Sequence, residues 1–247
     1  MRFEMMLPYQ IGQAIDEGWP VVLPLGVLEH HGPHLAAGLD TLVVLRLLER
    51  LEPERDMVIL PPFYYGAASH AVAAPERTGT LHVDAGVLYP LAQAMFAGLL
   101  RIGFCNIHFF VHHQTENFAA GMPTDLAFKF GARQAIFAHL QAERGEGWWG
   151  KGDMAAYYAE QAAGVDPFNW IKGHALMTPE IIAQYPFDHA GIGETSLLMA
   201  LCPEGVDMAR FSGEDWYTAS AAEASPELGE KGCALVLEHM RQVLSGT

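Results

Sequence analysis

The chain has 247 residues, and its 14 lysines and arginines against 29 aspartates and glutamates give a formal net charge of −15. This acidic excess argues against nucleic-acid binding, which needs cations to neutralise phosphates, and against binding to an anionic membrane surface. With 51% hydrophobic and 17% charged residues, the composition is that of a globular protein rather than a disordered one. We expect a single domain over residues 1–247.

The compartment is predicted from the cysteines and the N-terminus. The three cysteines are widely spaced and form no CxxC motif, which indicates a reducing environment without a disulfide framework. The first ten residues, MRFEMMLPYQ, lack the apolar stretch of a signal peptide. The longest apolar stretch, 95–111, is interrupted by polar residues and is too short to span a bilayer. We therefore expect a cytoplasmic protein with no membrane partner.

The predicted elements follow one another in a regular alternation. An apolar run over residues 20–26 (PVVLPLG) is typical of a buried parallel strand, and further strands are predicted at 56–61 and 106–111. Apolar periodicity and stop signals predict the helices, whose ranges are 41–51, 87–102, 124–144, 153–164, a segment beginning at 194, and 228–244. The segments 62–82 and 145–152 are predicted loops. Such alternation indicates an α/β fold, a layered α/β/α domain with a mostly parallel sheet.

Polar, histidine-rich loops follow two of the predicted strands. Ligands of parallel α/β sheets bind beyond the carboxyl ends of the strands. Glu29 and His31 are two residues apart, so on an extended segment they face the same way, and Asp40 follows near the next helix. Gln114 and Glu116 repeat this spacing on the second loop. Imidazole and carboxylate together suit zinc, manganese or iron. The alternative is a polar loop held by a structural salt bridge.

A third polar cluster contains Asp188, His189 and Glu194, which on their own also fit an ordinary helix start. Other residues near the predicted mouth have two interpretations. His34 and His113 are candidate substrate-binding residues. Together with His30 and His112 beside them, they either support the metal ligands or cap loops. Trp148 and Trp149 are either a packed loop anchor or a lid that closes over the substrate.

Three motifs resemble those of the creatininase (creatinine amidohydrolase) family. They are GVLEHHGPH from residue 26 with Asp40-Thr41 after it, PPFYYG from residue 61 with Gly79-Thr80 after it, and DHAGIGETS from residue 188. The resemblance implies a one-domain α/β fold with a two-metal site at the strand ends. It implies that Glu29, His31 and Asp40 are metal ligands, that Asp40 bridges both ions, and that His189 is the acid/base group. It also implies a homo-oligomer, a hexamer.

One departure from the family pattern concerns the second loop. The ligand histidine of that motif falls on Gln114 in this chain, whereas Glu116 and Asn117 fit a variant that retains a glutamate ligand. An amide oxygen is a weaker zinc ligand than imidazole. Three arrangements follow from this: Gln114 binds weakly, His113 or His112 takes its place, or only one metal site remains.

The sequence therefore predicts a metal-dependent hydrolase with one or two divalent ions. The expected reaction opens a small cyclic polar substrate when a metal-bound hydroxide attacks a carbonyl, most simply at a cyclic amide C–N bond. His189 would protonate the leaving atom, oriented by Asp188 or Glu194. One alternative is hydrolytic C–C cleavage of an inositol-derived cyclic diketone. A second is a ligand-binding protein of the same fold without catalysis.

Overall fold

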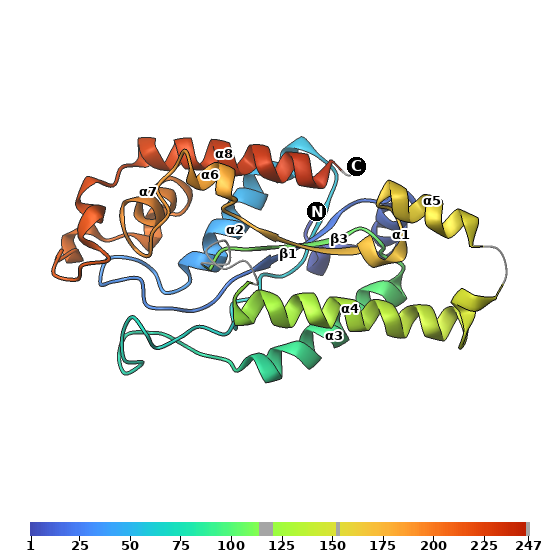
Figure 1. Ribbon diagram of the computed structural model, residues 1–247. Helices are drawn as coiled ribbons and strands as arrows, with labels where there is room; N and C mark the ends of the chain where they lie inside the picture. Colours follow the sequence, from blue (N-terminus) through green and yellow to red (C-terminus); the bar gives the residue numbers. More distant parts are fainter. Residues whose placement is uncertain (114–120, 152–153, 246–247) are drawn as a thin grey trace.

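The computed structural model describes residues 1–113, 121–151 and 154–245 (Figure 1). Its centre is a sheet of four parallel strands in the order β2-β1-β3-β4. The strands are β1 (Val21–Leu25), β2 (Val58–Ile59), β3 (Ile107–Val111) and β4 (Ile171–Ala175). The strands predicted at 20–26, 56–61 and 106–111 are thus β1, β2 and β3.

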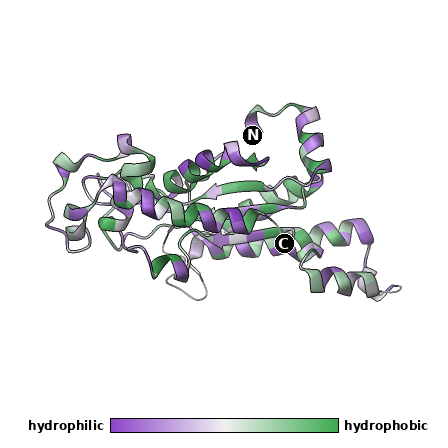
Figure 2. Ribbon diagram, turned by 90° about the horizontal axis from the view of Figure 1, so that it is seen from above, coloured by the Kyte–Doolittle hydropathy of each residue, from purple (hydrophilic) through white to green (hydrophobic). Residues whose placement is uncertain are grey.

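Helices cover both faces of the sheet. One face carries α3 (Ala85–Ile102) and α4 (Pro123–Arg144), and the other carries α2 (Leu39–Leu51), α6 (Pro179–Ile182), α7 (Ile192–Leu201) and α8 (Pro226–Leu244) (Figure 1). Helix α1 (Pro8–Asp16) lies at the end of the sheet, and its Ala14 joins the core formed with α3 and α4. Side chains alternate along each strand. Val21 and Leu23 therefore join the core formed with α3 and α4, and Val22 joins the core formed with α2, α7 and α8. Figure 2 shows the result as hydrophobic central strands and helices of mixed hydropathy. The layered α/β/α architecture is confirmed.

Three elements differ from the sequence prediction. Helix α1 and the short α6 were missed, and β4 (IKGHA) was missed because its lysine, glycine and histidine give no apolar pattern. The predicted helix 153–164 is α5 (Ala155–Ala163), which lies above the right-hand end of α4 in Figure 1. Gly103 ends α3 in the left-handed conformation with φ of 117°, as its position after the apolar run predicted.

Among the described residues, only α3 passes a length-and-apolarity test for a membrane span. That test is also passed by core helices of soluble proteins. Here Leu88, Ala92 and Phe96 of α3 are buried in the protein, and the helix packs along α4. The helix therefore contributes these side chains to the core.

The sheet brings the polar loops together. Leu25 at the end of β1 is the partner of Val111 at the end of β3, so the segments that follow these strands start side by side. Gly26 lets α2 begin against the end of β1, because a Cβ at this position would lie 2.6 Å from the backbone nitrogen of Thr41. Asp40 thereby lies in the first turn of α2, next to both loops.

Candidate functional site

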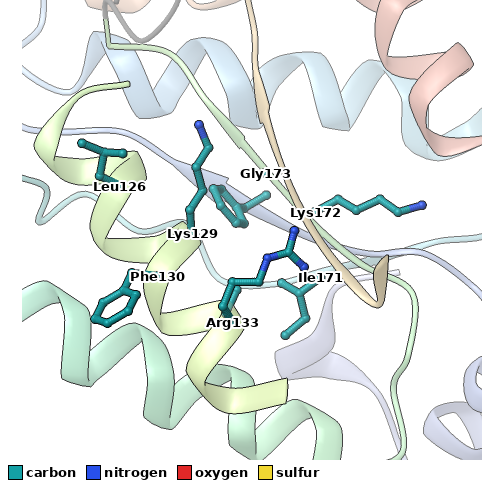
Figure 3. A pocket seen from close by; sticks show the side chains of 9 residues that line it. Leu126, Lys129, Phe130, Arg133, Ile171, Lys172 and Gly173 are labelled. Carbon is teal, nitrogen blue, oxygen red and sulfur yellow. The ribbon is translucent and has the colours of Figure 1, made fainter. Parts of the chain in front are cut away.

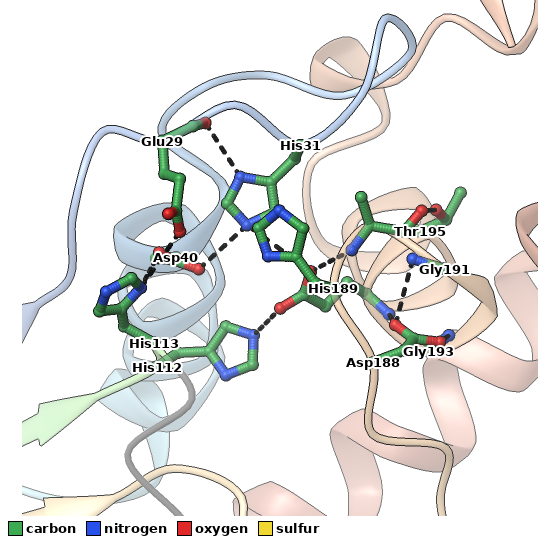
Figure 4. A network of polar contacts seen from close by, with 12 residues as sticks. Glu29, His31, Asp40, His112, His113, Asp188, His189, Gly191, Gly193 and Thr195 are labelled. Atoms are coloured by element: carbon green, nitrogen blue, oxygen red, sulfur yellow. Dashed lines mark hydrogen bonds and ion pairs between the residues drawn. The ribbon is translucent and has the colours of Figure 1, made fainter. Parts of the chain in front are cut away.

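A cluster of buried carboxylates and imidazoles lies at this carboxyl edge of the sheet (Figure 4). The loop after β1 provides Glu29 and His31, α2 provides Asp40, the end of β3 provides His112 and His113, and α7 provides Glu194. Each of these side chains is at most 6% exposed. Burying so many ionisable groups is costly unless they pair or bind a cation.

His31 is held by its own loop. Its Nδ1 lies 3.0 Å from the carbonyl oxygen of Glu29, and since a carbonyl only accepts, the proton belongs on Nδ1. Nε2 is therefore a lone-pair nitrogen when the ring is neutral, and it lies 3.4 Å from Asp40 Oδ1 and 3.6 Å from Glu194 Oε2. A backbone carbonyl that fixes the tautomer in this way is the usual support of a metal-binding histidine.

The other oxygen of Asp40 faces a second group. Oδ2 lies 3.2 Å from His113 Nδ1, and the same nitrogen lies 3.3 Å from Glu29 Oε2. Asp40 thus stands between two sets of side chains, with one oxygen directed to each. This is the position that a carboxylate bridging two cations would occupy.

Glu194 completes the set on the side of His31. Its Oε1 lies 3.0 Å from His112 Nε2, and its Oε2 accepts a hydrogen bond of 2.6 Å from the backbone nitrogen of Ala190. Ala190 has a φ of 56°, a left-handed conformation that alanine rarely adopts. The bond from Ala190 to Glu194 helps to hold this strained turn between His189 and α7.

The donor set fits divalent metal ions. Three groups place their ligand atoms within 4.8 Å of one another, namely Glu29–Asp40–His113, His31–Asp40–Glu194 and Glu29–His31–His189. Asp40 Oδ2 is buried and makes no well-directed hydrogen bond to any described residue. Each group offers three ligand atoms from carboxylates and imidazoles, and zinc, manganese and iron accept such ligands.

Without a metal, protons would have to balance the carboxylates. Burial alone would lower the pKa of His31, but Asp40 and Glu194 outweigh it and raise that pKa to about 9. Asp40 and Glu29 likewise overcome burial and raise the pKa of His113 to about 10. Burial would raise the pKa of Asp40, yet the two imidazoles hold it well below its usual range. The cluster therefore attracts positive charge strongly.

His189 lies at the edge of this cluster. Its ring stacks on that of His31 with centroids 4.4 Å apart, and its Nε2 lies 2.9 Å from the carbonyl oxygen of His30. The carbonyl requires the proton on Nε2 and leaves Nδ1 with a lone pair in the neutral ring. His30 is itself positioned by a bond from its backbone nitrogen to Thr80 Oγ1.

Asp188 has a different environment from the one expected. Its carboxylate accepts hydrogen bonds from the backbone nitrogens of Gly191, Gly193 and Glu194, at 3.2, 2.8 and 3.2 Å. It therefore caps the start of α7, and none of the contacts between described residues joins its side chain to His189. The expectation that Asp188 orients His189 receives no support from this geometry.

The remaining predicted residues near the mouth are placed as follows. His34 is buried, and its Nε2 lies 3.1 Å from Thr195 Oγ1, so it ties the first loop to α7. Gln114 and Glu116, predicted as ligands, lie outside the described residues.

Trp148 and Trp149 do not lie over the cluster. They follow the far end of α4, which starts beside the cluster and runs for 22 residues, about 33 Å, away from it (Figure 1). There they line a groove with Tyr157 and Tyr158. The expected lid is therefore not formed over this chain's own cluster in the structure, because α4 carries this loop to the other end of the sheet.

Two aromatic residues near the cluster were missed. Trp216 and Tyr217, in the loop between α7 and α8, line a cavity of about 270 Å³ together with His189, Ala71 and Val72. The signal available in the sequence was an aromatic pair within a loop rich in serine, glycine and acidic residues, at 212–220. A larger cavity of about 500 Å³ lies between α4 and β4 (Figure 3). It contains none of the clustered carboxylates and imidazoles, so we do not assign the chemistry to it.

Comparisons with known proteins agree with one another. The family model for creatininase, described as creatinine amidohydrolase, matches residues 4–226. The chain is 25% identical over 195 residues to creatinine amidohydrolase of Pseudomonas putida, a match covering 77% of this chain and 67% of that protein. It is 27% identical over 103 residues to 3-dehydro-scyllo-inosose hydrolase of Thermotoga maritima, covering 41% of this chain and 32% of that protein.

Solved structures share the fold. A structure described as "Creatininase Mn" has a TM-score of 0.68, and one of creatinine amidohydrolase (creatininase) has a TM-score of 0.66. Each is 20% identical to this chain, and each comparison covers 98% of this chain and 96% of the other.

Proposed function

This chain belongs to the creatininase family of metal-dependent hydrolases, and from that premise we propose that it opens a small cyclic polar substrate by hydrolysis of a cyclic amide C–N bond. The observation that carries the proposal is the position of Asp40, whose two oxygens face His31 and His113 at 3.4 and 3.2 Å. A buried carboxylate between two imidazoles, with further carboxylates on both sides, is the arrangement expected of a centre for divalent ions.

The proposed ligands divide into two sets that share Asp40. Glu29 and His113 complete one set, and His31 and Glu194 complete the other. His113 would thereby supply the imidazole that the family motif places at Gln114. Similar structures are described as creatininases of Mn and Zn-Zn type, and we propose the same choice of metals here. When bound, such ions provide a hydroxide at neutral pH and polarise a carbonyl.

Protonation and positioning would be provided by residues of the chain. Hydrolysis adds hydroxide to the carbonyl carbon, and the bond from that carbon to the ring nitrogen then breaks. His189 would give the leaving nitrogen its proton, because it borders the cluster and its ring is fixed by the bond from Nε2 to the His30 carbonyl. Asp188 and Glu194 would act at a distance from that proton, Asp188 by capping α7 and Glu194 by holding the turn at Ala190.

A second candidate reaction is hydrolytic C–C cleavage of an inositol-derived cyclic diketone. It is favoured by the match to 3-dehydro-scyllo-inosose hydrolase and by the glutamine at position 114. In that reaction hydroxide also adds to a carbonyl carbon, but the leaving group is a carbon stabilised as an enolate by the neighbouring carbonyl. His189 would then protonate carbon instead of nitrogen.

The test combines metal content with product formation. We expect the purified protein, dialysed against zinc or manganese, to retain at least one ion per chain and to hydrolyse a member of a panel of creatinine, 2-pyrrolidinone and 3-dehydro-scyllo-inosose. Asp40→Asn should lose both properties. Asp166→Asn is the matched control, because Asp166 is also a buried aspartate but caps a turn far from the cluster. Metal binding without any product, together with ligand-induced thermal stabilisation, would instead indicate a non-catalytic ligand-binding protein.

We further propose that the chain forms a homo-oligomer, as the family resemblance implies. Apolar side chains remain exposed along α3 and α4, among them Val87, Leu91, Phe130 and Phe137. Light scattering coupled to size-exclusion chromatography will give the mass directly, and a mass of one chain, 27.0 kDa, would contradict this proposal.

A further inference from the structure

The cavity beside His189 has a wall formed by two adjacent aromatic residues. Trp216 and Tyr217 lie with their ring centroids 6.0 Å apart in an edge-to-face arrangement, and Tyr217 lies 5.7 Å from His189. Trp216 is 89% exposed, so its indole ring is not needed to fill the protein core. A large apolar side chain left in solvent at the rim of a cavity is a feature of binding surfaces.

His189 connects this cavity to the carboxylate–imidazole cluster. One side of its ring stacks on His31, and Tyr217 lies near it in the cavity. A molecule in the cavity therefore lies against the group proposed to carry the proton. At about 270 Å³ the cavity is slightly below the size range of drug-binding pockets, which suits a single small ring.

The lining also indicates the charge of the ligand. Among the residues that the structure describes, the lining contains one imidazole, that of His189, and neither lysine nor arginine. Asp215 directly precedes Trp216 in the chain, so a carboxylate stands next to the aromatic pair. The described lining thus offers no lysine or arginine to pair with a charged substituent on a ring, whereas a neutral ring can stack on the aromatic wall and direct its polar groups to His189 and Tyr217.

From this arrangement we propose that Trp216 and Tyr217 form the platform on which an uncharged cyclic substrate packs beside His189. The inference rests on the proposed function and adds to it a substrate class and two specificity-determining residues. The place that Trp148 and Trp149 were expected to fill is taken, in this chain, by an aromatic pair from the loop between α7 and α8.

The experiment observes Trp216 directly. The five tryptophans are replaced by 5-fluorotryptophan, the Trp216 signal is assigned in the fluorine NMR spectrum with Trp216→Phe, and the metal-loaded protein is titrated with creatinine, 2-pyrrolidinone, 3-dehydro-scyllo-inosose and pyroglutamate. We expect at least one of the neutral ring compounds to shift the fluorine signal of Trp216 while the fluorine signal of Trp149 stays unchanged. Pyroglutamate, which is 2-pyrrolidinone with an added carboxylate, should shift it at least tenfold less at equal concentration.

Kinetics separate a binding wall from a structural role. For any compound that is hydrolysed, Trp216→Ala should raise KM about two- to tenfold, the range expected for loss of one aromatic contact, while kcat changes less than about twofold. Trp216→Phe should restore most of the loss, and Trp149→Ala should change neither constant.

The outcomes distinguish this inference from the proposed function. A shift of Trp216 without hydrolysis of any compound would support the platform and contradict the proposed reaction. Hydrolysis of a compound that leaves the Trp216 signal in place would overturn the platform and leave the reaction standing. No shift with any neutral ring, or an equal shift with pyroglutamate, would also overturn it.

Discussion

A pair of histidines away from the cluster, His108 buried and His174 half-buried, makes the fold sensitive to acid. His108 on β3 and His174 on β4 lie side by side, with His108 Nδ1 3.0 Å from His174 Nε2. His108 Nε2 lies 2.9 Å from Asn106 Oδ1, an acceptor, so the proton of neutral His108 is on Nε2 and its Nδ1 accepts from His174. Burial, with Lys172 and Arg55, lowers the pKa of His108 to about 4. Burial, and repulsion of a second positive charge by the neighbouring imidazoles and lysines, lower the pKa of His174 to about 3.

The size of the effect follows from linkage. The pKa values of both histidines in the folded state lie below the ordinary 6.5. The stabilisation is therefore present above pH 6.5 and is lost as the pH falls, because the unfolded chain then binds protons that the folded chain does not bind. Between pH 7 and pH 5 this amounts to about 2 kcal/mol for each histidine and about 4 kcal/mol for the pair. A loss of that size is a large part of the 5–15 kcal/mol that typically stabilises a domain.

Urea unfolding of the metal-loaded protein at pH 7 and pH 5 measures this loss. In the double variant His108→Gln, His174→Gln, which keeps polar groups at both positions without a titrating ring, we expect the loss on acidification to be smaller by about 4 kcal/mol. His70→Gln, at an exposed position, is the control and should behave as the unchanged protein. An equal loss in the double variant would refute the reasoning, because the acid sensitivity would then arise elsewhere.

Three further predictions concern packing and capping. Gly229→Ala should destabilise the protein by about 1–3 kcal/mol, because the added Cβ would collide with the carbonyl oxygen of Ser196 and separate α8 from α7. Gly98→Ala has open space around it and should stabilise α3 by about 0.5–1 kcal/mol. Thermal unfolding compares the two variants. Asp188→Ala should cost about 1 kcal/mol as a lost cap while the metal content stays unchanged, and loss of the metal would contradict the capping role. Phe128→Ala, at a fully buried position between α4 and the sheet, should lower the free energy of unfolding in urea by about 3–5 kcal/mol. A decrease below about 1 kcal/mol would show that neighbouring side chains fill the cavity.

The fold was predictable where burial leaves a pattern in the sequence. Strands β1 and β3 are buried on both faces, so β1 is a continuous apolar run and β3 is apolar apart from His108. Strand β4 lies at the edge of the sheet, where Gly173 makes room for the ring of Phe109 and where Lys172 is tolerated. Its sequence reflects these tertiary contacts rather than a strand pattern, so it was missed.

The candidate site was predictable only in part. The spacing of Glu29, His31 and Asp40 indicated a cluster, and the structure brings the three together. The positions of His112 and His113 were not predictable, because adjacent residues at a strand end face opposite ways and only the folded chain shows which one reaches Asp40. His113 points to Asp40, and His112 points to Glu194. The distance of Trp148 from the cluster likewise depends on the length and direction of α4.

The most direct test of the central claim is an anomalous-difference map from crystals of the protein grown with zinc and measured at the zinc absorption edge. We expect a peak between Asp40, His113 and Glu29, with His113 Nδ1 at a coordination distance of about 2.0–2.1 Å, and a second peak on the His31 side of Asp40 if both sets are filled. A map without a peak beside Asp40, or with His113 turned away from the ion, would show that these residues do not form the metal centre.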